Sequence, residues 1–393
     1  MRIVALILAT ATALAQSAPQ TRLSRTTESL RGVSAVSQKI AWASGTHGTY
    51  LRTTDAHIWI PDHVPGAESL DFRAVVAFSA DEAYLMSAGP GDQSRIYHTL
   101  NAGRNWNLQY TNTNPKGFFD AMLFWDRTHA IVLGDPIPDE SGNLKFELLM
   151  TEDGQTWTPI SAAQLPPALE GEGAFAASNS CLAILPNQNV IPSAARDPGF
   201  APATETLGPA QPPAQPHPSS SSAPDPNIWF ATGGKAARVF HSPDRGHTWE
   251  VFDTPIAHGP DSQGIFSIAF RDPTHGVIAG GDYKHPDQNG PNLAFTNDGG
   301  KTWTLSRIFP QSYYSAVAYD RRIDPNAKNL SDNEAHVRLF LVSPTFIYDF
   351  RPPRNPTRIS PRKKSELQFT AVSPYPEGGA LFVGPKGSIA TVP

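Results

Sequence analysis

Ser242-Pro-Asp244-Arg-Gly246-His-Thr248-Trp249 and Thr296-Asn-Asp298-Gly-Gly300-Lys-Thr302-Trp303 share one pattern, in which a hydroxyl residue, an Asp, a Gly and a Thr precede a closing Trp. We call this pattern the Trp turn. The Asp side chain can accept hydrogen bonds from N–H groups of its own turn, and the Gly supplies a residue with positive φ. The Trp ring can pack on the neighbouring hairpin. The pattern therefore predicts a tight turn between two antiparallel strands.

The Trp turn recurs along the chain. Thr151–Trp157 has a turn that is one residue shorter, Thr99–Trp106 carries Asn in the Asp position, and Thr53–Trp59 is a weaker copy. A motif that is repeated in every unit serves the repeat, whereas a catalytic group is needed once. We therefore predict structural roles for Asn101, Gly103, Trp106, Asp153, Trp157, Asp244, Gly246, Trp249, Asp298, Gly300 and Trp303.

The closing tryptophans give the length of the repeat. Their spacings are 47, 51, 92 and 54 residues, measured over Trp59, Trp106, Trp157, Trp249 and Trp303. The long spacing contains residues 186–226, a stretch rich in Pro, Ser and Ala that cannot form a core and that we predict to be a disordered insertion. A period near 50 residues with four strands per unit is typical of a β-propeller blade.

Paired apolar runs precede each Trp turn and predict the two inner strands of a blade. In the fourth unit we assign these runs to Ala174–Ala177 and Ile228–Ala231. Two C-terminal units keep the paired runs but lack the Trp turn, which brings the total to seven. The sequence thus predicts an all-β, seven-bladed propeller over residues 30–393. We expect the ring to close by pairing of residues near Leu30 with Ser388–Val392, which protects the open edges.

The N-terminus has the features of a secretory signal. Arg2 precedes the apolar stretch Ile3–Ala13, and Ala13-Leu14-Ala15 fits a cleavage site. We expect a signal peptide over residues 1–15, an N-terminal segment over 16–29 and a secreted or periplasmic protein without a transmembrane anchor after cleavage. An uncleaved anchor is the alternative.

Composition narrows the classes of partner and chemistry. The net charge of −5 gives no basic face, which argues against nucleic acid as a partner. Cys181 is the only cysteine, so no intrachain disulfide can form, and its apolar neighbours predict a buried packing residue. We predict no cofactor and no metal, and we expect a monomer.

Two features of the sequence resemble known families: the Trp turns, and a longer segment near the N-terminus. The Trp turns resemble the Asp-box (BNR) repeats of sialidases and other propellers. Leu30–Val36 followed by Ala41–Asp55 resembles the first blade of photosystem II stability/assembly factor-like propellers. This resemblance implies a seven-bladed, non-enzymatic protein that binds a partner protein during assembly. It implies no photosynthetic role, because many bacterial relatives occur where photosynthesis is not implied.

The resemblance to Asp-box propellers also implies which face carries a ligand, because in them the repeated turns lie on the opposite face. The loops between the second and third strands, and the links between blades, then face the ligand. Polar and aromatic residues in these segments suit a polar ligand or a peptide. The ligand-face candidates are Asp92, Asp120, Asp135, Glu172, Gln263, Asp282, His285, Tyr313 and Tyr314. We predict a protein- or carbohydrate-like ligand there; the alternative is that these are ordinary solvated loop residues.

Two alternative chemistries stay open at this point. A sialidase needs a cluster of three arginines together with a Tyr–Glu pair and an Asp. A glycoside hydrolase of another type needs a pair of carboxyl groups, such as Asp135 with Asp282 or Glu172. The string Trp59-Ile-Pro61 lacks the Arg of the Arg-Ile-Pro motif that sialidases carry. A metal site at Asp282, His285 and Asp287 is the weaker alternative, because the sequence has no paired His or Cys ligands around it.

Overall fold

The computed structural model describes residues 19–161, 163, 165–185, 227–307, 312–320, 337–351, 356–359 and 367–393. The predicted signal peptide (1–15) and insertion (186–226) lie outside the described residues. Within the described ranges the chain forms thirty strands and one short 3-10 helix, Gly91–Gln93. No helix in these ranges has the length and apolar character that a membrane span requires.

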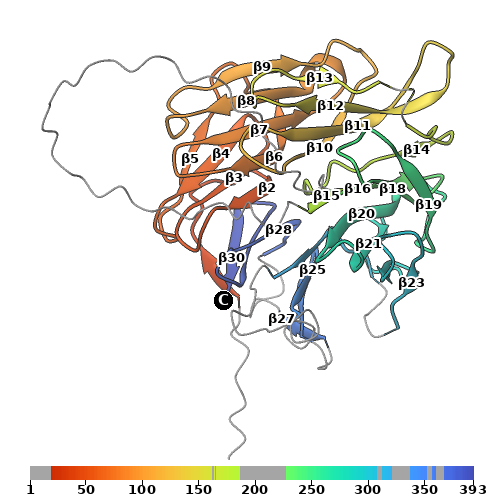
Figure 1. The fold of residues 1–393 in the computed structure, drawn as a ribbon. Helices are drawn as coiled ribbons and strands as arrows, with labels where there is room; N and C mark the ends of the chain where they lie inside the picture. The colour runs from red at the N-terminus through yellow and green to blue at the C-terminus, as the bar shows by residue number, and fades with distance from the viewer. Residues whose placement is uncertain are drawn as a thin grey trace, which may run out of the picture.

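The strands form seven antiparallel sheets arranged as the blades of a propeller, which confirms the predicted fold. In Figure 1 the innermost strands surround a common centre, and the fourth strand of each blade lies at the outside. Blades one to three contain β2 (Leu30–Ala35), β3 (Ala41–Gly45), β4 (Thr49–Thr53) and β5 (Ile60–His63); β6 (Asp71–Ala77), β7 (Ala83–Ala88), β8 (Arg95–Thr99) and β9 (Asn107–Thr111); and β10 (Phe119–Phe124), β11 (Ala130–Pro138), β12 (Leu144–Thr151) and β13 (Thr158–Pro159).

The remaining blades follow the same order from the centre outward. Blades four and five contain β15 (Leu182–Leu185), β16 (Asn227–Ala231), β18 (Arg238–Ser242) and β19 (Glu250–Asp253); and β20 (Gln263–Phe270), β21 (Gly276–Asp282), β22 (Leu293–Thr296) and β23 (Thr304–Leu305). Blades six and seven contain β24 (Ala316–Tyr319), β25 (Leu339–Ser343), β26 (Phe346–Phe350) and β27 (Thr357–Ile359); and β28 (Ala371–Pro374), β29 (Ala380–Gly384), β30 (Ser388–Val392) and β1 (Gln20–Arg22). Two short strands, β14 (Glu172–Gly173) and β17 (Gly233–Gly234), extend the sheet of blade five.

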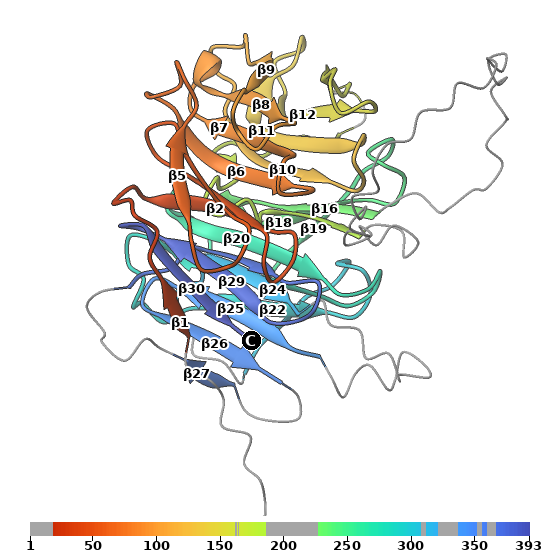
Figure 2. The same cartoon turned by 90° about the vertical axis from the view of Figure 1, so that its left-hand side faces the viewer.

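The ring closes at a different place from the one predicted. β30 pairs with β1, so Gln20 lies opposite Thr391 and Arg22 opposite Ile389. Figure 2 shows the dark red β1 beside the blue strands of the last blade, where it forms the edge of their sheet. The prediction that residues near Leu30 pair with the last strand is wrong, because Leu30 begins the innermost strand of blade one. The propeller therefore includes part of the predicted N-terminal segment.

Blade four begins later than predicted. The assignment of Ala174–Ala177 to its first strand is wrong, because the first strand is β15 and pairs with β16. Ala174–Ala177 instead belongs to the connection between blades three and four. Its small and apolar residues resemble those of an inner strand, but they serve a different contact that is described below.

Apolar side chains of neighbouring blades pack against each other to form the core. One cluster joins Tyr84 and Met86 of blade two to Phe119, Leu149 and Trp157 of blade three. A corresponding cluster joins blade one to blade seven. Because no blade can bury both faces of its sheet alone, this packing between blades supplies the stability of the ring.

Each Trp turn connects the third and fourth strands of its blade, as predicted. Its Asp or Asn oxygen accepts hydrogen bonds from the turn: Asp153 Oδ1 from the N–H of Gln155 and Thr156, both at 2.7 Å. These backbone bonds lower the pKa of Asp153 to about 2. The same bond joins Asn101 to the N–H of Asn105 at 2.9 Å, Asp244 to that of Thr248 at 2.8 Å and Asp298 to that of Thr302 at 2.9 Å.

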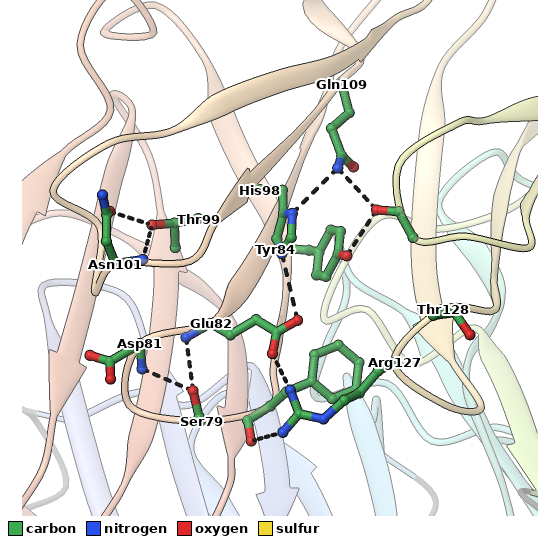
Figure 3. Close-up of polar contacts among 12 residues, drawn as sticks. Ser79, Asp81, Glu82, Tyr84, His98, Thr99, Asn101, Gln109, Arg127 and Thr128 are labelled. Atoms are coloured by element: carbon green, nitrogen blue, oxygen red, sulfur yellow. Dashed lines mark hydrogen bonds and ion pairs between the residues drawn. The ribbon is translucent and has the colours of Figure 1, made fainter. Parts of the chain in front are cut away.

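The Trp turns also join one blade to the next, which explains the glycine in the turn of blade three. Tyr84 of blade two donates to the carbonyl of Gly154 in the turn of blade three at 2.9 Å, and its ring stacks on His98 (Figure 3). Gln109 donates to the same carbonyl at 3.0 Å and accepts from Trp157. Gly154 has φ +69°, and a Cβ on it would lie 2.8 Å from the Tyr84 hydroxyl. A residue with a side chain would therefore push the two blades apart.

Candidate functional site

Strand direction divides the connections between the two ends of the ring. Because neighbouring strands are antiparallel, the Trp turns share one end with the turns between first and second strands. The turns between second and third strands and the links between blades lie at the other end, which we call the channel mouth. All nine predicted ligand-face residues belong to segments at the channel mouth.

Four innermost strands carry a β-bulge at the same position near the channel mouth. In each strand one residue has no partner in the register with the second strand. This residue follows a large apolar residue and precedes a small one. Such bulges redirect a side chain and are common next to functional sites. The bulged residues are Arg31, Arg73, Asp120 and Phe266.

The two arginines among the bulged residues both lie close to the carboxylate of Asp71. Arg73 Nε lies 2.7 Å from Asp71 Oδ2, and Arg31 Nε lies 3.7 Å from Asp71 Oδ1. Burial, and next the charge of Arg73, lowers the pKa of Arg31. The sequence interpretation missed all three residues. The innermost strands of these four blades share a large apolar residue and, two positions later, a small one. Aligning the strands on these two residues would have shown that the residue between them differs from blade to blade.

Asp120 is buried. Its exposed fraction is 1%, and among the described residues no hydrogen bond of ordinary geometry reaches either carboxylate oxygen. Burial, and next the neighbouring carboxylate of Asp135, raises the pKa of Asp120 well above its usual value, while Arg73 and the N–H of Ala176 oppose this effect. An ionised carboxylate in such a place is costly, so burial favours the protonated form of Asp120.

Asp135 lies beside Asp120 and is partly exposed. Burial raises its pKa to about 6, although a hydrogen bond from the N–H of Ala174 at 3.0 Å acts in the opposite direction. Asp120 and Asp135 are thus two neighbouring carboxyl groups at the channel mouth, and the pKa of each is raised.

The connection between blades three and four, residues 172–180, crosses the channel mouth; we call it the link segment. Its contacts reach blades on several sides of the ring: Arg73 Nη1 of blade two donates to Ala176 O at 2.8 Å, Asn179 pairs with the backbone of Met122 of blade three, and Ser178 Oγ donates to Ser315 O beside blade six at 2.9 Å. A segment that contacts blades two, three and six at once lies over the central axis.

Phe175 of the link segment occupies an aromatic slot. Its ring stacks on that of Phe266 with 3.9 Å between centroids and 7° between planes. A Cβ on Gly233 would lie 2.2 Å from the Phe175 ring, and one on Gly264 would lie 3.0 Å from it. We call this site, formed by Phe266, Gly233 and Gly264, the Phe slot. The two glycines are what makes room for the ring.

The aromatic surface continues outward from the Phe slot. Tyr313 meets the Phe266 ring edge to face at 4.9 Å and is buried, as is consistent with the rise in its pKa through burial. Tyr283 lies 6.0 Å from Phe266 and is 48% exposed. Tyr283, Phe266 and Tyr313 thus form an aromatic shelf beside the link segment, with Tyr283 at its exposed edge.

Three predicted residues next to the shelf bind one another. Asp282 accepts from the N–H of Lys284 at 2.9 Å, lies 2.9 Å from His285 Nδ1 and accepts from Gln263 Nε2 at 3.5 Å. Burial acts to raise the pKa of Asp282, but the hydrogen bonds, first that of His285, outweigh it and lower the pKa to about 2. This carboxylate therefore stays ionised and holds the loop that carries Tyr283.

Three other predicted residues lie apart from this surface. Glu172 is buried in an ion pair with Arg238, whose Nε lies 3.0 Å from Glu172 Oε1, and Thr232 donates to the same oxygen at 2.6 Å. Tyr314 is fully buried and packs against Tyr348 in the core. The side chain of Asp92 is 77% exposed and lies 3.8 Å from Arg95.

The alternative chemistries find little support in this geometry. In the described part of the chain no group of three or more His, Cys, Asp or Glu side chains is placed to hold a metal ion. Both carboxylates proposed as hydrolytic partners of Asp135 are engaged, Asp282 with His285 and Glu172 with Arg238. Asp120 lies closer to Asp135 but is buried.

Comparison with known proteins shows similarity of fold only. No model of a protein family matches the chain, and no curated protein matches it. Among solved structures, "YCF48 bound to D1 peptide" is 14% identical and covers 97% of this chain and 98% of its own, with a TM-score of 0.59. YCF48 from Cyanidioschyzon merolae is 16% identical over 96% and 98%, with a TM-score of 0.55.

A glycoside hydrolase is also similar in fold. The GH74 xyloglucanase from Xanthomonas campestris is 14% identical and covers 95% of this chain but 53% of its own length, with a TM-score of 0.54. The structural likeness to YCF48, a photosystem II assembly factor, agrees with the resemblance noted from the sequence. At these identities the likeness establishes the seven-bladed propeller and leaves function to the residues of the site.

Proposed function

We propose that this protein is an exported binding propeller that holds a segment of a partner protein at its channel mouth. The observation that carries the proposal is the aromatic shelf, whose edge residue Tyr283 is half exposed at the same end of the ring as the partly exposed Asp135. Exposed aromatic side chains next to a few oriented polar groups are typical of protein-binding surfaces. YCF48, which shares the fold, has been seen with a bound peptide.

Hydrolysis of a glycoside is the weaker candidate. Such an enzyme needs two carboxyl groups that face the substrate, one as acid and one as base or nucleophile. Asp135, with its pKa of about 6, suits the acid, but the neighbouring carboxylates are buried or held by other side chains. This arrangement favours binding over hydrolysis.

Site-specific photo-crosslinking in the producing cell tests the proposal. A photoreactive phenylalanine analogue in place of Tyr283 should give a discrete adduct with a partner protein. The matched control is the same analogue in place of Leu100, which is 69% exposed within the Trp turn of blade two, at the opposite end of the ring. Equal adducts from both positions, or none from position 283, would reject binding at the channel mouth.

Export is tested separately on the same material. N-terminal sequencing of the mature protein should find a start within a few residues after Ala15, in the extracytoplasmic fraction. A protein that retains Met1 in the cytoplasm would reject the export part of the proposal and leave the binding part to the crosslinking result.

A further inference from the structure

We infer that the channel mouth is a peptide-binding site occupied by the protein's own link segment, and that its external ligand is an extended peptide with an aromatic residue flanked by small residues. This inference rests on the proposed function and names the chemistry of the partner segment. Its basis is that three features of peptide recognition converge on residues 172–176: strand addition, reading of backbone groups and a slot for one side chain.

The link segment enters the site as an added strand. β14 pairs antiparallel with β17, with Glu172 opposite Gly234 and Gly173 opposite Gly233, and Gly233 in turn pairs with Gly264 of β20. A two-residue strand at the edge of another sheet is the geometry by which many domains bind extended peptides. No other blade has such an added strand at the channel mouth among the described residues.

Charged side chains form hydrogen bonds with the backbone of the residues that follow β14. Asp135 accepts from the N–H of Ala174, and Arg73 donates to the carbonyl of Ala176. These contacts involve only backbone atoms of the link segment, so any peptide in the same extended conformation could make them. Hydrogen bonds to charged groups are also stronger than those between neutral groups.

Specificity comes from the position between these two contacts. Phe175 inserts its ring in the Phe slot, where Phe266 stacks on one side and the two glycines leave room on the other. Stacked aromatic rings at this distance attract each other beyond the effect of burial alone. The neighbours Ala174 and Ala176 are both buried, so larger residues would not fit beside the ring.

A connection between two blades does not require an added strand or an inserted aromatic ring. Other blade links here, such as residues 64–70 between β5 and β6, run from one outer strand to the next inner strand without such a slot. A segment that places its only aromatic residue in a slot built from another blade behaves as a ligand held in cis. An external peptide then competes with it, and its apparent affinity is reduced by the fraction of time for which the site is closed.

The test is binding in trans of a fluorescein-labelled peptide with the sequence of residues 171–179 to the full-length protein. By fluorescence anisotropy, the Phe175→Ala protein should bind this peptide at least tenfold more tightly than the native protein does. A peptide with Ala in place of its Phe should show no such gain. Adding Gly233→Ala to the Phe175→Ala protein should abolish binding, because the new Cβ fills the Phe slot.

Two outcomes would overturn the inference. One is a Phe175→Ala protein with a native near-UV circular dichroism spectrum that binds the peptide no better than the native protein; the other is equal binding of the Phe and Ala peptides. If Phe175→Ala does not fold, Phe175→Leu replaces it and should give a smaller gain. Crosslinking from position 283 of the native protein does not depend on these variants, so binding at this face could stand while the inference fails.

Discussion

The two ends of the propeller follow different rules. At the Trp-turn end one contact recurs, in which an aromatic side chain of one blade donates to a Gly carbonyl in the turn of the next blade. At the channel mouth the contacts differ from blade to blade, as in the Glu172–Arg238 ion pair, the buried carboxyl group of Asp120 and the stacked ring of Phe175. Contacts that are repeated between blades therefore identify the residues that hold the ring together. Contacts that differ from blade to blade identify the surface that is available for a specific function. The repeated bonds are Tyr50 to Gly103 at 3.0 Å, Tyr84 to Gly154 at 2.9 Å and Trp229 to Gly299 at 2.8 Å.

The largest expected effect concerns the ion pair that anchors the link segment. Arg238→Ala should lower the free energy of unfolding by about 3–5 kcal/mol, because Glu172 would remain as a buried charge without a partner. Urea denaturation measures this change. The matched control is Arg104→Ala at the Trp-turn end, where the exposed Nε donates only to Asn101 O and the expected loss is below about 0.5 kcal/mol. Similar losses for both variants would contradict the distinction between the two ends.

The second effect has the opposite sign and depends on pH. Burial raises the pKa of Asp135 from 3.8 to about 6, so the folded protein binds the proton more tightly than the unfolded chain does. The unfolding free energy of the native protein should therefore fall as pH rises from about 4 to about 6. Asp135→Asn retains an acceptor for the N–H of Ala174 and should remove this loss, a gain of about 2–3 kcal/mol at pH 7 and little at pH 4.

The pH dependence also separates the buried carboxyl groups from the exposed ones. Asp120→Asn should stabilise the protein in the same direction, since Asp120 is buried beside Asp135 and its pKa is also raised. The control is Asp92→Asn, whose side chain is 77% exposed, and it should change the free energy of unfolding by less than about 0.5 kcal/mol. A profile for Asp135→Asn that runs parallel to the native one would show that Asp135 is already solvated.

The blades were predictable from the sequence because their signal is repeated. The Trp turns gave five blades at intervals of about fifty residues once the insertion is removed, and the paired apolar runs gave the last two, without any long-range information. The closing strand was not predictable in this way. Gln20–Arg22 pairs with β30 through backbone hydrogen bonds, and a three-residue strand with exposed side chains carries no apolar pattern.

The channel mouth was only partly predictable for the same reason. Asp135, Asp282, His285 and Tyr313 were found because their loops stand out as long or polar. Ala174–Ala177 was misassigned because small residues that pack over an axis resemble those of an inner strand. Arg31 and Arg73 escaped notice because a β-bulge alters the facing of a residue without changing the local sequence pattern.

A smaller effect tests whether the Trp-turn contacts are equivalent. Tyr50→Phe and Tyr84→Phe each remove one hydroxyl that donates to a turn carbonyl in the next blade. Each should therefore lower the free energy of unfolding by about 1 kcal/mol, with the two values within about 0.5 kcal/mol of each other. Chemical denaturation of both variants gives the comparison. Unequal values would show that the repeated contact carries different weight in different blades.

The smallest effect on stability is expected where the effect on binding is largest. Tyr283 is 48% exposed and touches Phe266 only at the edge of its ring, so Tyr283→Ala should change the free energy of unfolding by less than about 0.5 kcal/mol. The same substitution should weaken binding of a partner identified by crosslinking by about tenfold or more, as is typical of an aromatic residue central to an interface. Leu100→Ala should change neither quantity. If Tyr283→Ala unfolds the protein, Tyr283 is a residue that stabilises the ring. The proposed difference between a stabilising Trp-turn end and a binding channel mouth would then be wrong for this residue.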